Sequence, residues 1–266
     1  MACNRGVVLG ESVKAHFVGS LAGVLCCALG LGALAEEPAS FNILKLAGNN
    51  VRWQQAPGNQ GLFVTYRLVT EPVASPGARN CRRMASLDQL LATSNLTAAA
   101  VRRELAAAFA MWEEAANIRF GEAPDGGRAN ILIGAQAEPE GWAFADVFYD
   151  TASAERYKPI SQSLICLNPT KRWKIGFDGD LKVYDLRYTF AHEIGHAIGL
   201  DHPSGSGQIM GYRYEERFRS LQAGDRMGAT LLYGERKPDD VQITSGPIPN
   251  KAQQPSATRA IAAPTP

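Results

Sequence analysis

Residues 192–203 read His-Glu-Ile-Gly-His-Ala-Ile-Gly-Leu-Asp-His-Pro, and this stretch decides how the rest of the chain must fold. His192 and His196 are four residues apart, so on a helix they lie about one turn apart on the same face. If the helix continued to His202, the rise of about 1.5 Å per residue would carry that backbone roughly 15 Å from the first histidine. Because Gly199 can adopt the left-handed conformation that ends a helix, we expect the chain to turn there and bring His202 back.

Three converging imidazoles predict a metal site. Neutral histidines suit zinc best, and three protein ligands leave its fourth position for water, as in catalytic zinc sites. Zinc lowers the pKa of such a water to about 7, and a neighbouring carboxylate can take its proton. Glu193 follows His192 on the same helix and is therefore the candidate general base.

The N-terminal segment has the pattern of a secretory signal peptide. Arg5 and Lys14 precede an apolar run over residues 17–34, and Ala33-Leu34-Ala35 is a small-residue cleavage signal. A membrane anchor, the alternative, needs about 20 apolar residues without a cleavage site, whereas this run is short and contains Gly and Ser. We therefore expect removal of residues 1–35, a secreted or periplasmic protein, and no stable membrane insertion.

The composition supports the metal site and gives no sign of a nucleic-acid partner. Of the four histidines only His16 lies outside the motif, and it falls within the predicted signal peptide. Histidines scattered by chance would not gather in one short segment. The 27 Lys and Arg balance 26 Asp and Glu, so the chain has no strongly basic character that would favour nucleic acid.

Two cysteines, Cys81 and Cys166, remain after the signal peptide. Export places both in an oxidising compartment, which favours a disulfide over the alternative of two reduced, buried thiols. Such a bridge would close a long loop and stabilise the fold by a few kcal/mol in the chain-entropy treatment.

Hydrophobic periodicity predicts an α+β domain over residues 50–235, in which several strands precede the main helices. The expected helices are residues 96–116, 185–199 and 221–233, with Thr97 and Gly234 as caps. The expected strands are residues 62–69, 117–120, 130–134, 142–149 and 163–167. Residues 36–49 form an N-terminal lead-in, and residues 236–266, rich in Pro, Ala, Gln and Ser, are expected to be a disordered tail.

The long histidine motif resembles that of the metzincins, zinc peptidases in which a methionine-containing turn follows the third histidine. Residues 206–212, Ser-Gly-Gln-Ile-Met-Gly-Tyr, match this turn, with Met210 as the methionine that packs beneath the metal without binding it. Within the metzincins, residues 50–234 are most similar to the matrixins, particularly to their short bacterial members. The resemblance implies a catalytic domain with a twisted five-stranded mixed sheet and three helices.

The resemblance also implies a monomeric endopeptidase with an active-site cleft, in which an extended substrate pairs with the strand near residues 141–148. A hydrolase of another amide, such as a cell-wall peptide, would use the same chemistry. The alternative from another class is a non-catalytic zinc-containing module that binds peptide or matrix. Glu193 favours the enzyme, because a binding module has no need of a carboxylate beside the metal.

Some residues depart from the matrixin pattern. Pro203 and Tyr212 are more similar to the serralysins, and that resemblance makes Tyr212 a candidate transition-state stabiliser, with an ordinary surface tyrosine as the alternative. The structural zinc of animal matrixins needs further histidines, so we expect one zinc ion. Asp178 and Asp180 are candidate calcium ligands, although a hydrophilic turn explains them equally well.

Overall fold

The computed structural model describes residues 39–54, 61–124, 127–205 and 207–236 of the 266-residue chain. The predicted signal peptide lies outside these ranges, as does the predicted tail beyond residue 236. None of the helices in the described part combines the length and the hydrophobicity that crossing a bilayer requires.

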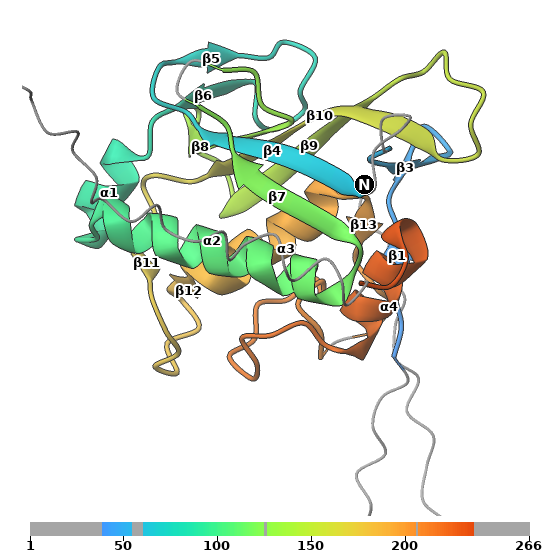
Figure 1. The fold of residues 1–266 in the computed structure, drawn as a ribbon. Helices are drawn as coiled ribbons and strands as arrows, with labels where there is room; N and C mark the ends of the chain where they lie inside the picture. Colours follow the sequence, from blue (N-terminus) through green and yellow to red (C-terminus); the bar gives the residue numbers. More distant parts are fainter. Residues whose placement is uncertain (1–38, 55–60, 125–126, 206, 237–266) are drawn as a thin grey trace, which may run out of the picture. The chain divides into compact units, whose positions relative to one another are not determined.

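Five strands form the centre of a mixed sheet, in the order β7-β4-β8-β10-β9 (Figure 1). Their bounds are β4 (Leu62–Leu68), β7 (Ile118–Glu122), β8 (Ile131–Gln136), β9 (Ala143–Tyr149) and β10 (Lys158–Leu167). The first four strands of this order are parallel to one another, and β9 is antiparallel to β10. All five correspond to strands predicted from the sequence, and the α+β class is confirmed.

Four short strands extend this sheet and were not predicted. They are β2 (Lys45–Leu46), β3 (Asn49–Arg52), β5 (Val73–Ala74) and β6 (Arg83–Ala85). Two separate pairs also form, β1 (Asn42–Ile43) with β13 (Leu200–Asp201) and β11 (Trp173–Lys174) with β12 (Tyr184–Asp185). Elements this short carry no readable hydrophobic period. Part of the expected lead-in, residues 42–46, thus pairs with the domain.

The described part contains four helices, one more than the sequence predicted. They are α1 (Asp88–Ser94), α2 (Ala98–Ala115), α3 (Leu186–Ala197) and α4 (Ala223–Tyr233). The additional helix, α1, has 7 residues. It is capped by Asn95, whose left-handed φ of 53° prevents the helix from continuing into α2. The Thr97 side chain accepts a hydrogen bond from the Ala100 N–H and caps α2, as predicted.

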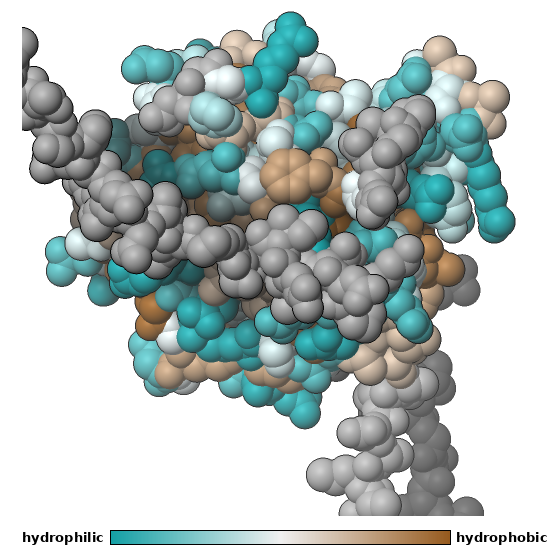
Figure 2. All heavy atoms as spheres, viewed as in Figure 1, coloured by the Kyte–Doolittle hydropathy of each residue, from teal (hydrophilic) through white to brown (hydrophobic). Residues whose placement is uncertain are grey.

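The main core lies between the sheet and the helices, where α2 and α3 share one side (Figure 1). Trp112 of α2 is fully buried, and its indole N–H donates to the Ala191 carbonyl of α3 at 3.0 Å. The apolar stripe of α2 faces this core, whereas Arg102, Arg103 and Glu114 on its other side are exposed. Figure 2 shows many hydrophilic residues on the part of this outer face that is not drawn in grey. Hydrophobic burial therefore fixes α3, the helix that carries His192 and His196, against a rigid base.

A smaller core lies on the other face of the sheet. Side chains alternate along a strand, so Leu164 and Cys166 of β10 point into this smaller core while their neighbours join the main one. The predicted disulfide between Cys81 and Cys166 is confirmed, with Cα atoms 5.7 Å apart. It attaches the segment before β6 to the middle of the sheet.

Candidate metal centre

The three predicted ligands converge. His192 and His196 lie on α3, and His202 follows β13. The His202 Nε2 is 3.1 Å from the His192 Nε2 and 3.2 Å from the His196 Nε2, and the ligand atoms of the group all lie within 4.8 Å of one another. Nitrogens that each bind one zinc at about 2.0–2.1 Å must lie no more than about 4 Å apart. The two Nε2–Nε2 separations that involve His202 lie within this limit, so the three histidines are positioned to share one metal ion.

Gly199 makes the turn that brings the third histidine back. Its φ is 101°, in the left-handed region that glycine adopts without strain. A Cβ at this position would lie 2.4 Å from the Val51 carbonyl oxygen, so a side chain would also collide with the backbone of β3. The Gly199 N–H donates to the His196 carbonyl at 2.9 Å and closes the helix end.

Backbone carbonyls orient the two helical histidines. The His192 Nδ1 lies 2.7 Å from the Ile209 carbonyl oxygen, and the His196 Nδ1 lies 2.9 Å from that of Leu200. A proton on Nδ1 that donates to a carbonyl leaves Nε2 free to bind metal. Burial lowers the pKa of His192 to about 3 and that of His196 to about 4, so both rings are neutral near pH 7.

The Met210 side chain is buried against α3, where it packs on Gly195, a residue for which the sequence predicted no role. A Cβ on Gly195 would meet the Met210 Sδ at 2.2 Å and the Trp112 ring at 2.9 Å, so only glycine allows this approach. The Asp225 carboxylate accepts hydrogen bonds from the backbone N–H groups of Ile209 and Met210, both at 3.0 Å. Gly195 occupies a variable position of the histidine motif, and Asp225 is distant in sequence, so periodicity indicated neither role.

Glu193 is buried beside the histidines, with 6% of its surface exposed. No hydrogen bond or ion pair engages its carboxylate within the described residues. Burial, and secondarily the negative charge of Asp146, raise the pKa of Glu193 to about 8. A cation at the three imidazoles would favour the ionised form and lower this pKa.

A cleft of about 600 Å³ lies over His192, His196 and His202. Residues 142–148 form one of its walls, and Glu193 lines it. Several further lining residues were not singled out from the sequence: Leu44, Leu46, Gly77, Ala78, Arg79, Asn80, Tyr184, Tyr188, Thr189 and Tyr214. They come from segments far apart in the chain, which is why sequence patterns did not reveal them.

Comparison with known proteins agrees with this geometry. The profile of the Matrixin family, Peptidase M10, matches residues 87–234. The chain belongs to the matrixin family. This matrixin is 31% identical to stromelysin-3 of Xenopus laevis over 144 residues, which are 52% of this chain and 29% of the relative.

Two further relatives represent the two groups that the sequence resembles, the serralysins and the matrix metalloproteinases. The matrixin is 34% identical to serralysin of Photorhabdus laumondii over 96 residues, 35% of this chain and 18% of the relative. It is 26% identical to matrix metalloproteinase-19 of Mus musculus over 174 residues, 59% of this chain and 32% of the relative. The chain thus spans less than a third of the length of each of these relatives. The similarity to both groups confirms a matrixin with serralysin-like features.

Tyr212, the serralysin-like residue of this matrixin, stands at the mouth of the cleft. It is 81% exposed, and its ring centroid lies 5.2 Å from that of His202, with the ring planes at 82°. No hydrogen bond holds its phenol among the described residues. Tyr212 thus lies beside His202, one of the three predicted metal ligands.

The ammonium group of Lys174 lies beside Asp178 and Asp180, the candidate calcium ligands. Its ammonium group donates to the Asp178 carboxylate and, at 2.8 Å, to the Asp180 carbonyl. It also lies 2.5 Å from a carboxylate oxygen of Glu216. This side chain already supplies the positive charge that these oxygens attract, so calcium at Asp178 and Asp180 stays a prediction that the contacts do not favour.

Proposed function

We propose that this matrixin is a secreted zinc endopeptidase in which His192, His196 and His202 hold the metal and Glu193 is the general base. The observation that carries the proposal is the convergence of three neutral imidazole nitrogens beside an unbonded carboxylate, within one cleft. When bound, zinc would polarise the scissile carbonyl and lower the pKa of the attacking water.

Glu193 is placed to move the protons of the reaction. As the general base it takes a proton from the attacking water, and as the general acid it returns a proton to the leaving amine. A carboxyl group that is buried and bonded to no other residue is free to change its protonation state in this way. Tyr212 is a candidate donor to the oxyanion that develops on the substrate carbonyl.

The free edge of β9 supports binding of the substrate as an extended strand. The Trp142 carbonyl accepts from the Asn168 N–H at 2.7 Å, so the backbone groups of the even-numbered residues of β9 point toward β10. Those of Ala143, Ala145 and Val147 consequently point to the other edge, where no described strand pairs with them. An added peptide would satisfy these groups and lie along the cleft.

The protein is further proposed to be exported from the cell and to act as a monomer. The disulfide supports an oxidising compartment, as does the signal-peptide pattern of residues 1–35. One chain supplies the three histidines and Glu193, so the proposed chemistry needs no second copy.

The decisive experiment measures cleavage of a peptide library and of unfolded proteins by the purified, zinc-loaded protein. Glu193→Ala should lower kcat by about 10²–10⁴-fold with zinc content unchanged, because only the general base is removed. Glu114→Ala, the same substitution on the exposed face of α2, should leave the rate unchanged. Absence of cleavage, or equal cleavage by wild type and Glu193→Ala, would refute the enzyme and favour the non-catalytic binding module.

A further inference from the structure

The segment before β6 forms part of the cleft wall on the side away from the helices. Gly77, Ala78, Arg79 and Asn80 all line the cleft, together with Phe144, Asp146 and Phe148 of β9. Ala78 and Cys81 are buried in the smaller core, whereas Arg79 between them is exposed. Of the four loop residues that line the cleft, Arg79 is the charged one.

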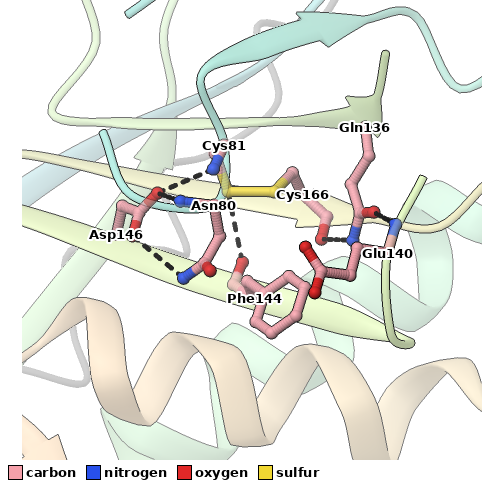
Figure 3. The surroundings of a disulfide bond; sticks show 7 residues. All are labelled: Asn80, Cys81, Gln136, Glu140, Phe144, Asp146 and Cys166. Carbon is pink, nitrogen blue, oxygen red and sulfur yellow. Dashed lines mark hydrogen bonds between the residues drawn. A yellow bond between two sulfur atoms is a disulfide. The ribbon is translucent and has the colours of Figure 1, made fainter. Parts of the chain in front are cut away.

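The backbone that carries Arg79 is fixed from several directions. Asp146 of β9 is buried, and its carboxylate accepts from the N–H of Asn80 at 2.8 Å and from that of Cys81 at 2.7 Å (Figure 3). It also accepts from the Asn80 side-chain amide at 3.2 Å. The disulfide then joins Cys81 to Cys166 of β10. Because these contacts already hold the loop backbone, that backbone loses little conformational entropy when Arg79 engages a ligand.

Arg79 has no acidic partner within the described structure. No hydrogen bond or ion pair engages its guanidinium there, and the nearby Asp146 carboxylate is already bonded to the loop backbone. Among the described residues that line the cleft, Arg79 is the one Lys or Arg side chain. An unpaired guanidinium at the wall of a peptide cleft is suited to bind a carboxylate, with two parallel hydrogen bonds.

The contacts of the loop locate this charge along β9. A Cβ on Gly77 would lie 3.3 Å from the Phe148 ring, and Asn80 is bonded to Asp146. Arg79 therefore flanks the part of β9 that ends at Phe148. At the opposite end, Trp142 immediately precedes β9, and its ring stacks on Tyr184 with centroids 4.0 Å apart.

We propose that Arg79 is a specificity-determining residue, which selects substrates that place Asp or Glu beside Val147 and Phe148. The inference rests on the proposed peptidase function, since it concerns the substrate of that same cleft. A peptide that pairs with the edge of β9 has a side chain every 3.3–3.4 Å, so one position along the substrate comes within reach of the guanidinium. An acidic side chain there replaces water around Arg79 with a charge-assisted hydrogen bond.

The test uses peptides in which a single Glu or Gln is placed at successive positions on either side of one cleaved bond. At one position, the Glu peptide should have a kcat/KM about two- to fivefold higher than the Gln peptide at low salt, the size expected for a solvent-exposed ion pair. The preference should shrink as salt screens the charges. Arg79→Gln should abolish the preference, and Arg79→Glu should reverse it.

Arg82→Gln is the matched control, because Arg82 is an exposed arginine of the same segment that does not line the cleft. It should keep the preference for Glu. Equal cleavage of the Glu and Gln peptides by wild type, or a preference that survives in Arg79→Gln, would overturn the role of Arg79 while the cleavage itself upholds the peptidase.

Binding of the same peptides to Glu193→Ala separates the two proposals further. One outcome is that wild type cleaves no peptide, that Glu193→Ala binds Glu peptides more tightly than Gln peptides, and that the additional change Arg79→Gln removes this difference in affinity. In that case the role of Arg79 stands without the peptidase. If the peptides bind equally or do not bind, and none is cleaved, both proposals are overturned.

Discussion

The side-chain amide of Asn42 donates a hydrogen bond to the backbone carbonyl of His202 at 2.8 Å, across 160 positions of sequence. The surrounding backbone reinforces this bond, because β1 pairs with β13 and the Leu44 N–H donates to the Gly199 carbonyl at 2.9 Å. The segment that the sequence suggested was a lead-in thus holds the turn that carries the third histidine.

Replacing Asn42 by Ala should weaken zinc binding. The substitution frees the His202 backbone from one of its restraints, and we expect an increase of about tenfold in the zinc Kd, the lower end for groups that orient a metal ligand. Competition with a chromophoric chelator measures this constant. Asn49→Ala is the control, since Asn49 bonds only to carbonyls of its own turn. An unchanged Kd in Asn42→Ala would show that β1 does not position His202.

Gly195→Ala should destabilise the domain by about 1–3 kcal/mol through overpacking. The added methyl group would meet the Met210 Sδ at 2.2 Å, and both residues are enclosed by the core. Urea unfolding of the zinc-free protein measures the loss. In the background Met210→Ala the same change should cost less, because the sulfur has gone. Equal costs in the two backgrounds would contradict a direct contact between these positions.

Removal of the disulfide by Cys81→Ser and Cys166→Ser together should lower the free energy of unfolding by about 4–5 kcal/mol in the chain-entropy treatment. The bridge closes a loop with a sequence separation of 85, and the unfolded chain gains freedom when it opens. Urea unfolding with and without a reductant tests this. The reductant should shift the wild-type midpoint and leave that of the double variant unchanged, whereas equal stability of the two proteins would contradict the prediction.

Tyr212→Phe should lower kcat by about tenfold, less than the loss seen for rigid oxyanion donors, because the side chain is exposed. Zinc content should not change, since Tyr212 is outside the ligand set. Steady-state kinetics with metal analysis measures both. Tyr157→Phe removes a phenol outside the cleft lining and serves as the control. Undiminished turnover would leave Tyr212 as an ordinary surface residue.

Glu216→Gln should destabilise the domain at neutral pH and have little effect in acid. Desolvation raises the pKa of Glu216, but hydrogen bonds from Lys174, Gly179 and Tyr214 together bring it below its ordinary value of 4.5. The unfolded chain therefore binds this proton at a higher pH than the native chain. The stabilisation is present above about pH 4.5 and is lost as the pH falls through the native pKa.

Urea unfolding between about pH 7 and pH 3 measures this effect. The stability difference between wild type and Glu216→Gln should shrink as the pH falls. Glu114→Gln, on the exposed face of α2, should show no such pH-dependent difference. A constant difference at all pH values would mean that the substitution acts through packing and not through the charge.

Local chemistry explains what the sequence could predict. The spacing of His192, His196 and His202 with Gly199 is a property of helix geometry and of glycine, so the convergence of the three histidines was predictable before any fold was known. Long periodic segments such as α2 and β4 were predicted within a few residues. By contrast, α1 and the strands of two to four residues contain too few positions to show a period.

The sequence by itself determined the helix of His192 and His196, the turn that follows it, the matrixin resemblance and the two cysteines available to pair. Only the tertiary structure decided which distant residues support and line the site: Asn42 at His202, Met210 at Gly195, Lys174 among the candidate calcium ligands, and Arg79 at the cleft. The physical reason is that spacing along a helix or strand is set by bonded geometry. A contact between distant segments exists only after hydrophobic burial has packed the sheet against the helices.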